Sequence, residues 1–175
     1  AGRAFTIVLI LGGVGTAAYF VASVAQLLAV DVLRKLVPGS WMEKAIERIS
    51  GHIIVCGYGR FGQIVVAELG RSKVPVLIVE QDPGKRAELD RSGHPYLLGD
   101  ATSDEVLQRA QLDRARAIVA GTSTDPDNVF ITLASRERRK DLLIHARGET
   151  LEATRRLKQA GADYVVSAYQ MAGVS

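Results

Sequence analysis

The segment HIIVCGYGRFG, residues 52–62, carries the clearest indication of the fold of this chain. It begins with a continuous apolar run, which is typical of a strand buried on both faces of a parallel sheet. Gly57, Gly59 and Gly62 follow in the spacing GxGxxG and open a helical stretch. After a strand, this spacing favours a dinucleotide site. The first glycine permits a tight turn, the second lets a pyrophosphate approach the backbone, and the third lets helix and strand pack closely.

The alternation of strand and helix continues through residues 51–175. Further apolar runs occur at 74–80, 94–100, 114–120, 142–146 and 162–166. Helical stretches are expected at 60–70, 83–92, 102–110, 126–139 and 149–160. This order predicts one α/β domain with a Rossmann-like, doubly wound parallel sheet in the strand order 3-2-1-4-5-6.

The residues between the glycines are candidates for the same site. Tyr58, Arg60 and Phe61 lie at the start of the expected helix, whose first backbone N–H groups are free to bind phosphate. Arg60 adds a positive charge there, although its side chain could equally point into solvent. We therefore assign the whole motif to a cofactor site.

Glu80 ends the second apolar run, 18 residues after Gly62. At this position a carboxylate accepts hydrogen bonds from the adenosine ribose hydroxyls and repels a 2′-phosphate. Gln81 and Asp82 follow where an NADP site would place an arginine, so NAD(H) is favoured over NADP. A solvated carboxylate at a strand end is the alternative. ATP, ADP and AMP carry the same ribose, so the spacing does not separate them from NAD(H).

A second feature lies in the amino-terminal part of the chain. Phe5–Val30 is a run of 26 residues without a charged side chain. About 20 helical residues cross the hydrocarbon core of a bilayer, so the run predicts one transmembrane helix before the α/β domain. Gly12, Gly13 and Gly15 weaken its middle and favour a hinge. A secretory signal would have a shorter apolar core, and a chain of this size rarely buries a helix that is apolar all round.

A short connection joins the apolar run to the α/β domain. Arg34 and Lys35 follow the run and favour a cytoplasmic position for this end. Ser40 and Glu43 have the spacing of a capping box and predict a short helix. The expected division is a transmembrane helix at 1–36, a linker at 37–50 and the nucleotide-binding domain at 51–175.

Several segments together resemble one family. They are HIIVCGYGRFG, VLIVEQD at 76–82, GDAT at 99–102, DPDNVFITL at 125–133 and AGADYVVS at 160–167. The domain resembles the regulator-of-potassium-conductance (RCK) domain, also called the potassium-transport, nucleotide-binding or TrkA-N domain. Residues 1–20 are similar to the inner, pore-lining helix that follows the selectivity filter in two-transmembrane prokaryotic potassium channels.

The resemblance extends the candidate site to three further strand ends. In the family, the segment with Asp100, Ala101 and Thr102 borders the adenine. Asp100 could accept from its exocyclic amine, or could cap the next helix instead. Thr122 follows the fourth strand at the same edge. Arg147 could meet a phosphate or form a structural ion pair, and Asn128 could position its loop or cap its helix.

The resemblance also implies a function. It implies a segment of a ligand-gated potassium channel in the inner membrane, with lipid around the helices and K⁺ as the transported ion. Four inner helices would line the pore, and the nucleotide-binding domains would form a cytoplasmic ring. The filter sequence, of the TVGYGD type, does not occur in residues 1–175, so we expect a fragment of a longer polypeptide. A regulatory subunit of a potassium uptake or efflux transporter is the alternative.

Other functions have less support in the sequence. An NAD-dependent oxidoreductase is disfavoured because the histidines show no convergent acid/base set, so no catalytic residue is assigned. The histidines and Cys56 lack metal-ligand spacing, and of the stretches where some relatives bind calcium only Arg147-Gly148-Glu149 contains an acidic residue. We expect no metal site. The net charge of +3 does not indicate nucleic acid, because the basic run at 135–141 falls at an expected helix end.

Overall fold

The computed structural model describes residues 39–167, with the side chains of residues 39–41 excepted. The internal contacts divide the chain into two units, Ala1–Trp41 and Met42–Ser175. The predicted transmembrane run Phe5–Val30, with the hinge residues Gly12, Gly13 and Gly15, lies outside the described residues. Among the helices that are described, none has both the length and the apolar character needed to cross a membrane.

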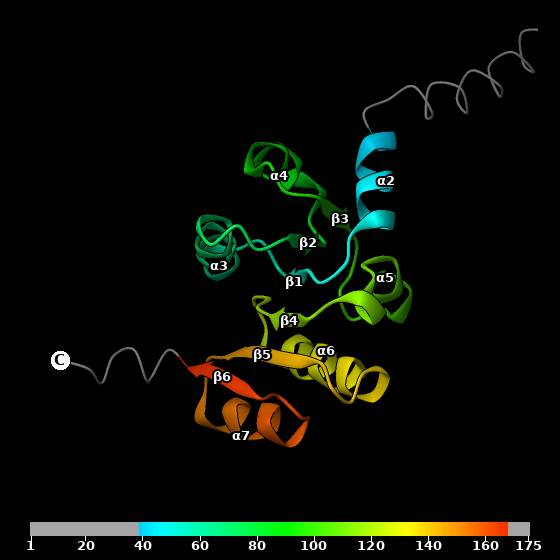
Figure 1. The fold of residues 1–175 in the computed structure, drawn as a ribbon. Coiled ribbons are helices and arrows are strands. Elements are labelled where there is room, and N and C mark those ends of the chain that lie inside the picture. Colours follow the sequence, from blue (N-terminus) through cyan, green and yellow to red (C-terminus); the bar gives the residue numbers. More distant parts are fainter. Residues whose placement is uncertain (1–38, 168–175) are drawn as a thin grey trace, which may run out of the picture. The chain divides into compact units, whose positions relative to one another are not determined.

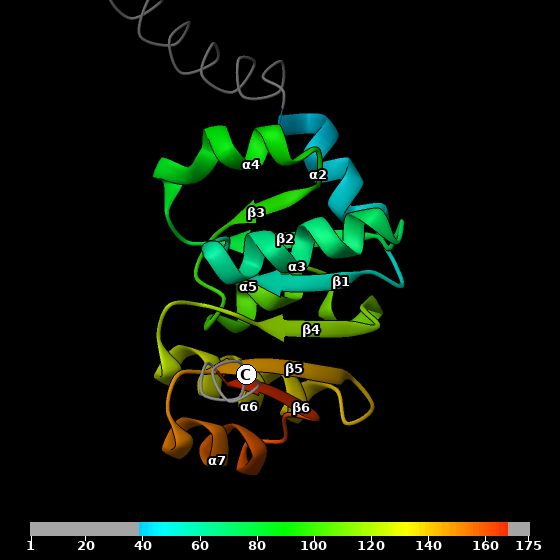
Figure 2. The same ribbon diagram turned by 90° about the vertical axis from the view of Figure 1, so that its left-hand side faces the viewer.

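Six parallel strands form one sheet in the order β3-β2-β1-β4-β5-β6, which Figure 2 shows from top to bottom. The predicted Rossmann-like architecture and strand order are thereby confirmed. The strands are β1 (Ile53–Cys56), β2 (Val76–Glu80), β3 (Tyr96–Leu98), β4 (Ala117–Ala120), β5 (Leu143–Gly148) and β6 (Tyr164–Ser167).

The register places the ends of the strands at one level. Cys56 is paired with Val79 on one side and with Ala120 on the other, and Ala120 is paired in turn with Ala146. The residues that follow these strands therefore meet at one carboxyl edge of the sheet, where open α/β sheets bind their ligands.

Helices cover both faces of the sheet (Figure 1). They are α2 (Gly39–Arg48), α3 (Arg60–Arg71), α4 (Arg86–Ser92), α5 (Asp104–Arg109), α6 (Asp125–Arg138) and α7 (Leu151–Gln159), with 3₁₀ turns η1 (Pro83–Lys85) and η2 (Leu112–Arg114). Helices α3 and α4 pack with Val55 and Ile78 on one face. Helices α5, α6 and α7 pack with Ile54 and Ile118 on the other. Residues of β1, β2 and β4 alternate between two apolar layers and are buried throughout, whereas β5 and β6 are buried mainly on one face.

Some element bounds differ from the prediction. The helix expected at 83–92 is a 3₁₀ turn followed by α4, because the Asp82 side chain accepts from the N–H of Gly84 and holds a separate turn. The helix expected at 102–110 begins at Asp104, since Asp100 and Thr102 form a turn of their own. In the linker, Ser40 lies inside α2 and not before it.

Candidate nucleotide-binding site

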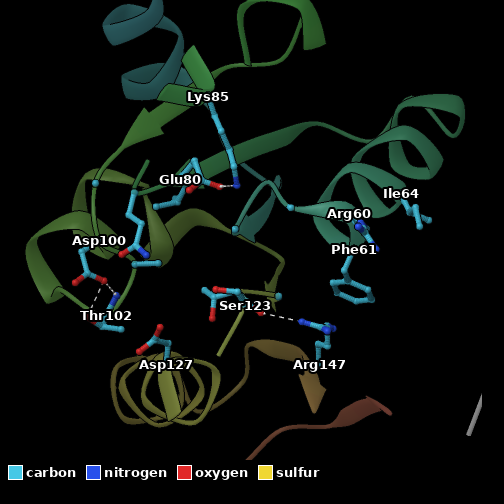
Figure 3. Close-up of a pocket in the computed structure, with 18 of the residues that line it drawn as sticks. Arg60, Phe61, Ile64, Glu80, Lys85, Asp100, Thr102, Ser123, Asp127 and Arg147 are labelled. Carbon is cyan, nitrogen blue, oxygen red and sulfur yellow. Dashed lines mark hydrogen bonds and ion pairs between the residues drawn. The ribbon is translucent and has the colours of Figure 1, made fainter. Parts of the chain in front are cut away.

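A cavity of about 520 Å³ lies at the carboxyl edge of the sheet (Figure 3). Its walls come from the segments that follow β1, β2, β3, β4 and β5. Eleven of the thirteen residues predicted for the cofactor site line it: Gly57, Gly59, Arg60, Phe61, Glu80, Gln81, Asp100, Ala101, Thr102, Thr122 and Arg147. The sequence prediction did not include Ile64, Val79, Lys85, Gly99, Gly121, Ser123, Asp127 and Glu149, which line the same cavity.

The three glycines of the motif perform different structural tasks. Gly57 has a φ of +91°, and a Cβ there would lie 2.9 Å from the carbonyl oxygen of Gly121. A Cβ at Gly62 would lie 1.9 Å from the carbonyl oxygen of Gly57, so the start of α3 can lie against the turn only without a side chain. A Cβ at Gly59 would meet nothing within 4 Å. Gly59 therefore leaves room beside the cavity.

The start of α3 is open to an anion. Gly59 is the residue before the helix and offers no side-chain cap to its first N–H groups. Unpaired N–H groups and the positive end of the helix dipole attract phosphate. Arg60 is exposed at this end of the helix and lines the cavity, as Figure 3 shows.

Two residues of the predicted motif do not line the cavity. Tyr58 is 8% exposed, and its ring packs in the apolar layer beneath α3. Its backbone N–H donates to Glu80 Oε2 at 2.6 Å. Gly62 is buried in the first turn of α3. Tyr58 and Gly62 therefore contribute to the packing behind the cavity wall and not to its surface.

Glu80 is a buried acidic group of the site with several hydrogen-bond donors around it. It is 5% exposed, so it is not the solvated strand-end carboxylate of the alternative interpretation. Its carboxylate accepts from the N–H groups of Tyr58 and Asp82 (2.6 and 3.0 Å) and from Lys85 Nζ (3.1 Å). Burial raises the pKa of Glu80, but these hydrogen bonds and the charge of Lys85 outweigh burial and hold the pKa below its ordinary value. Glu80 is therefore ionised at neutral pH.

Lys85 is a site residue that the sequence analysis missed. The turn η1 begins with Pro83 and returns the chain, so that Lys85 reaches the Glu80 carboxylate five residues upstream. The Pro-Gly pair after the strand end was the available signal, because such pairs reverse the chain direction. The ammonium group places a positive charge at the expected ribose position.

The segment after β3 forms a small polar turn. Asp100 Oδ1 accepts from the backbone N–H of Thr102 at 2.9 Å and from its hydroxyl at 2.7 Å. The residue before α5 is Ser103, so Asp100 does not cap that helix. Asp100 is exposed and lines the cavity, where a base amine could donate to its carboxylate. Ala101 is buried and anchors the turn in the core.

Asn128 organises the other half of the edge. It is 1% exposed and lies in the first turns of α6. Its Oδ1 accepts from the N–H and the hydroxyl of Thr122, both at 2.8 Å, and its Nδ2 donates to the carbonyl of Arg147 at 2.9 Å. Thr124 supplies the cap of α6 by accepting from Asp127 N–H. Of the two predicted roles for Asn128, the structure shows the positioning of the loop.

Arg147 lines the cavity and also forms an ion pair. Its guanidinium pairs with Glu149 and donates to the carbonyl of Thr122 at 3.2 Å. The N–H of Glu149 donates to Asp125 Oδ1 at 2.8 Å, so the pair is linked to the start of α6. Figure 3 shows Arg147 opposite Glu80 and Lys85, across the space that a ligand would fill.

Comparison with known proteins gives the family of this domain. The family model of the TrkA-N domain matches residues 53–168. The chain belongs to the TrkA-N domain family. The match begins with β1 and continues to the end of β6, so it contains every strand of the sheet and every wall of the cavity.

Relatives of this TrkA-N domain include potassium channel proteins. The probable potassium channel protein 2 of Methanocaldococcus jannaschii is 34% identical over 177 residues, which cover 99% of this chain and 51% of that protein. The chain thus spans about half the length of this relative. The crystal structure of the GsuK RCK domain is 36% identical with a TM-score of 0.60, over 66% of this chain and 24% of that one. GsuK bound to ADP is 31% identical with a TM-score of 0.62, over 76% and 34%.

The remaining reactive groups of the TrkA-N domain lie away from the cavity. Cys56 is fully buried, and burial raises the pKa of its thiol to about 12, so it is a core residue. Neither histidine nor cysteine is among the residues that line the cavity. Within residues 39–167, no group of three or more His, Cys, Asp or Glu side chains could hold a metal ion.

Arginines of the basic run at 135–141 form hydrogen bonds and ion pairs within the domain. Arg136 donates to the carbonyl of Gly161 and pairs with Asp163 at 2.7 Å. Arg138 pairs with Asp113, also at 2.7 Å. These arginines join the end of α6 to neighbouring loops, and their charge is partly neutralised by acidic partners.

Proposed function

We propose that residues 51–175 are the ligand-sensing domain of a potassium channel and that they bind NAD(H) or an adenine nucleotide in the cavity described above. One observation carries the proposal. Gly57 and Gly59 of the motif, the ionised Glu80 and the Asp100 turn line one cavity, in a chain that is similar over 99% of its length to a potassium channel protein.

The ligand would lie along the carboxyl edge in a definite direction. Its pyrophosphate would contact the first N–H groups of α3 and Arg60, and its ribose would lie beside Glu80 and Lys85. The adenine would lie against the Asp100 turn. The terminal part would reach Thr122 and Arg147, where a phosphate could replace Glu149 as the partner of the guanidinium. The ADP-bound GsuK structure supports an adenine nucleotide as one ligand class.

The remaining parts of the proposal concern the membrane. Residues 1–36 would form the inner, pore-lining helix, with a hinge at Gly12, Gly13 and Gly15, and residues 37–50 would link it to the domain. Four chains would surround the pore in the inner membrane, and their nucleotide-binding domains would assemble on the cytoplasmic side. The nucleotide would act as a regulatory ligand of K⁺ conduction and not as a redox reactant.

A thermal-melting panel with NAD⁺, NADH, NADP⁺, ATP, ADP and AMP tests ligand binding. A ligand at 100 times its Kd stabilises the folded state by about 2.7 kcal/mol, which is easily measured as a rise in Tm. We expect NAD(H) or an adenine nucleotide to raise the Tm, and NADP⁺ to do so less because Glu80 repels its 2′-phosphate. If none of the six changes the Tm, the proposed function is wrong.

Glu80→Gln sharpens the same experiment. The amide keeps the shape of the side chain but removes the charge that faces the ribose and Lys85, so we expect nucleotide affinity to fall roughly tenfold. Glu68→Gln is the matched control, because Glu68 lies exposed on α3 in a surface pair with Arg71. Equal affinities of Glu80→Gln and the parent would show that the ligand does not contact this wall.

A further inference from the structure

The linker helix α2 is attached to the nucleotide-binding domain through its apolar face. Ile46 is 8% exposed and belongs to the core layer beneath α5, α6 and α7. Met42 and Ile49 pack against the same layer. In addition, Met42 Sδ accepts from the backbone N–H of Tyr96, at 3.3 Å. Tyr96 begins β3, so α2 contacts the strand whose other end leads to the cavity.

The carboxyl end of α2 accepts hydrogen bonds from the side chain of Arg114. The last carbonyl groups of a helix have no partner within the helix and need one elsewhere. Arg114 supplies it: Nη1 donates to the carbonyl of Glu47 at 2.8 Å, and Nη2 donates to that of Arg48 at 3.4 Å. The carbonyl of Arg114 in turn accepts from the N–H of Gly51 at 2.8 Å. Arg114, the last residue of η2, is therefore hydrogen-bonded both to the end of α2 and to Gly51, which follows the helix.

Only Ala110 and Gln111 separate η2 from α5, and only Ser103 separates α5 from the cavity wall at 99–102. A Cβ at Gly99 would lie 2.9 Å from Cγ2 of Val106, so the wall segment is in contact with α5. Val106 and Leu107 are buried in the core, which ties the helix to the sheet. Figure 1 shows α5 and α2 on the same face of the sheet.

A buried histidine fixes the far end of α5. His52 is fully buried, and its Nε2 lies 3.0 Å from the carbonyl oxygen of Ala110, the residue after the helix. Burial lowers the pKa of His52 and outweighs the hydrogen bond to Ala110, which raises it, and the charge of Arg114 lowers the pKa further. The ring is therefore neutral and Nε2–H is the donor. Within the described residues its Nδ1 has no partner. The position of α5 is thus set at one end by the cavity wall and at the other by His52.

We propose that Arg114 is the coupling residue between the nucleotide cavity and the linker. A ligand that displaces the wall segment 99–102 displaces α5, and Arg114 passes this displacement to the carbonyl end of α2. The inference rests on the proposed function and deepens it, because it names the contact through which the ligand regulates the attached segment. The ligand acts only through its different affinity for the two positions of the wall.

The test uses the full-length protein in lipid vesicles, with K⁺ flux measured without nucleotide and with saturating ADP or NADH. In Arg114→Met the stem of the side chain is kept and the donors are lost. We expect its nucleotide Kd to stay within about twofold of the parent, while the factor by which the nucleotide changes the flux, in either direction, shrinks at least about fivefold towards one. Arg114→Lys keeps one point charge and should give an intermediate ratio.

Arg116→Met is the matched control. Arg116 is exposed two residues further on, and its side chain forms no hydrogen bond or ion pair with the described residues. It should keep the flux ratio of the parent. An unchanged ratio in Arg114→Met, or a Kd raised tenfold, overturns the inference, because Arg114 then either does not couple or acts on the cavity itself.

Hydrogen exchange tests the coupling in the parent protein, without any substitution. In the full-length parent, saturating ADP or NADH should change the exchange of the α2 amides at 42–48. If the nucleotide binds and changes the flux but leaves this exchange unchanged, the coupling route is wrong while the proposed function stands. If the parent neither binds nucleotide nor changes its flux, the proposed function itself has failed.

Discussion

The two halves of the cavity are built by opposite means. Around β1 the wall is shaped by missing side chains, because Gly57 and Gly62 let the turn and α3 approach within distances that no Cβ allows. Around β4 and β5 the wall is shaped by one added side chain, the buried amide of Asn128, which joins Thr122 to Arg147. The first half leaves backbone N–H groups available to a ligand, whereas the second presents side chains that are already paired.

Because the two halves are built differently, we expect them to respond differently to substitution. A wall formed by close backbone approach cannot accept even a methyl group, since the atoms it would meet are backbone atoms that cannot move alone. A wall formed by a buried amide tolerates small changes of shape but not the loss of its hydrogen bonds, because the groups left behind are buried without partners.

The largest expected effect belongs to the glycine half. Gly62→Ala places a methyl group 1.9 Å from the carbonyl oxygen of Gly57, so the turn or α3 must shift. We expect the free energy of unfolding to fall by about 3 kcal/mol or more, as measured by urea denaturation. The control is Gly59→Ala, whose Cβ meets nothing within 4 Å.

Gly59→Ala should leave stability within about 0.5 kcal/mol of the parent, because its φ of −81° suits any residue. Nucleotide affinity should nevertheless fall by about tenfold, since the methyl group would occupy the approach of the pyrophosphate. Equal stabilities of the two alanine variants would contradict the different tasks assigned to these glycines.

An intermediate effect is expected in the amide half. Asn128→Ala leaves the N–H of Thr122 and the carbonyl of Arg147 without their partner, so unfolding should become easier by about 2–3 kcal/mol in urea. Ser135→Ala is the matched control on the same helix. Its hydroxyl is buried and has no hydrogen-bond partner in the described part of the chain, so its removal should cost little. Similar losses in both variants would show that Asn128 acts through packing alone.

The smallest expected effect is the pH dependence of stability that arises from two histidines, one before β1 and one on β5. Burial lowers the pKa of His52, which precedes β1, and of His145, which lies on β5. The unfolded chain therefore binds protons more readily than the folded one. Stability is complete above about pH 6.5 and declines as the pH falls below that value.

Urea denaturation at pH 7.5 and 5.5 measures this decline. His52→Gln should reduce it more than His145→Gln, because His52 is fully buried while His145 is half-buried and stacked on Tyr164. The lowered pKa of Glu80 does not interfere, since its contribution is lost only at pH values below its ordinary pKa of 4.5. A larger reduction in His145→Gln would reverse the assigned order.

The sequence predicted the glycine half of the cavity better than the amide half. The spacing of the glycines after an apolar run has few structural solutions, and Glu80 follows at a distance fixed by the helix and strand between them. Lys85 was missed because its approach depends on the 3₁₀ turn of η1. The sequence also did not show which partner Arg147 has, since a phosphate and Glu149 are equally suitable for a guanidinium.

The order of strands and helices, the turn at Gly57 and the position of the cavity follow from the sequence alone, because apolar periodicity and missing side chains act over a few residues. The pairing of polar groups across the edge and the contact of Arg114 with the end of α2 depend on the folded structure. Those contacts join residues up to 67 positions apart. Their formation depends on strand register and helix packing, which no local pattern specifies.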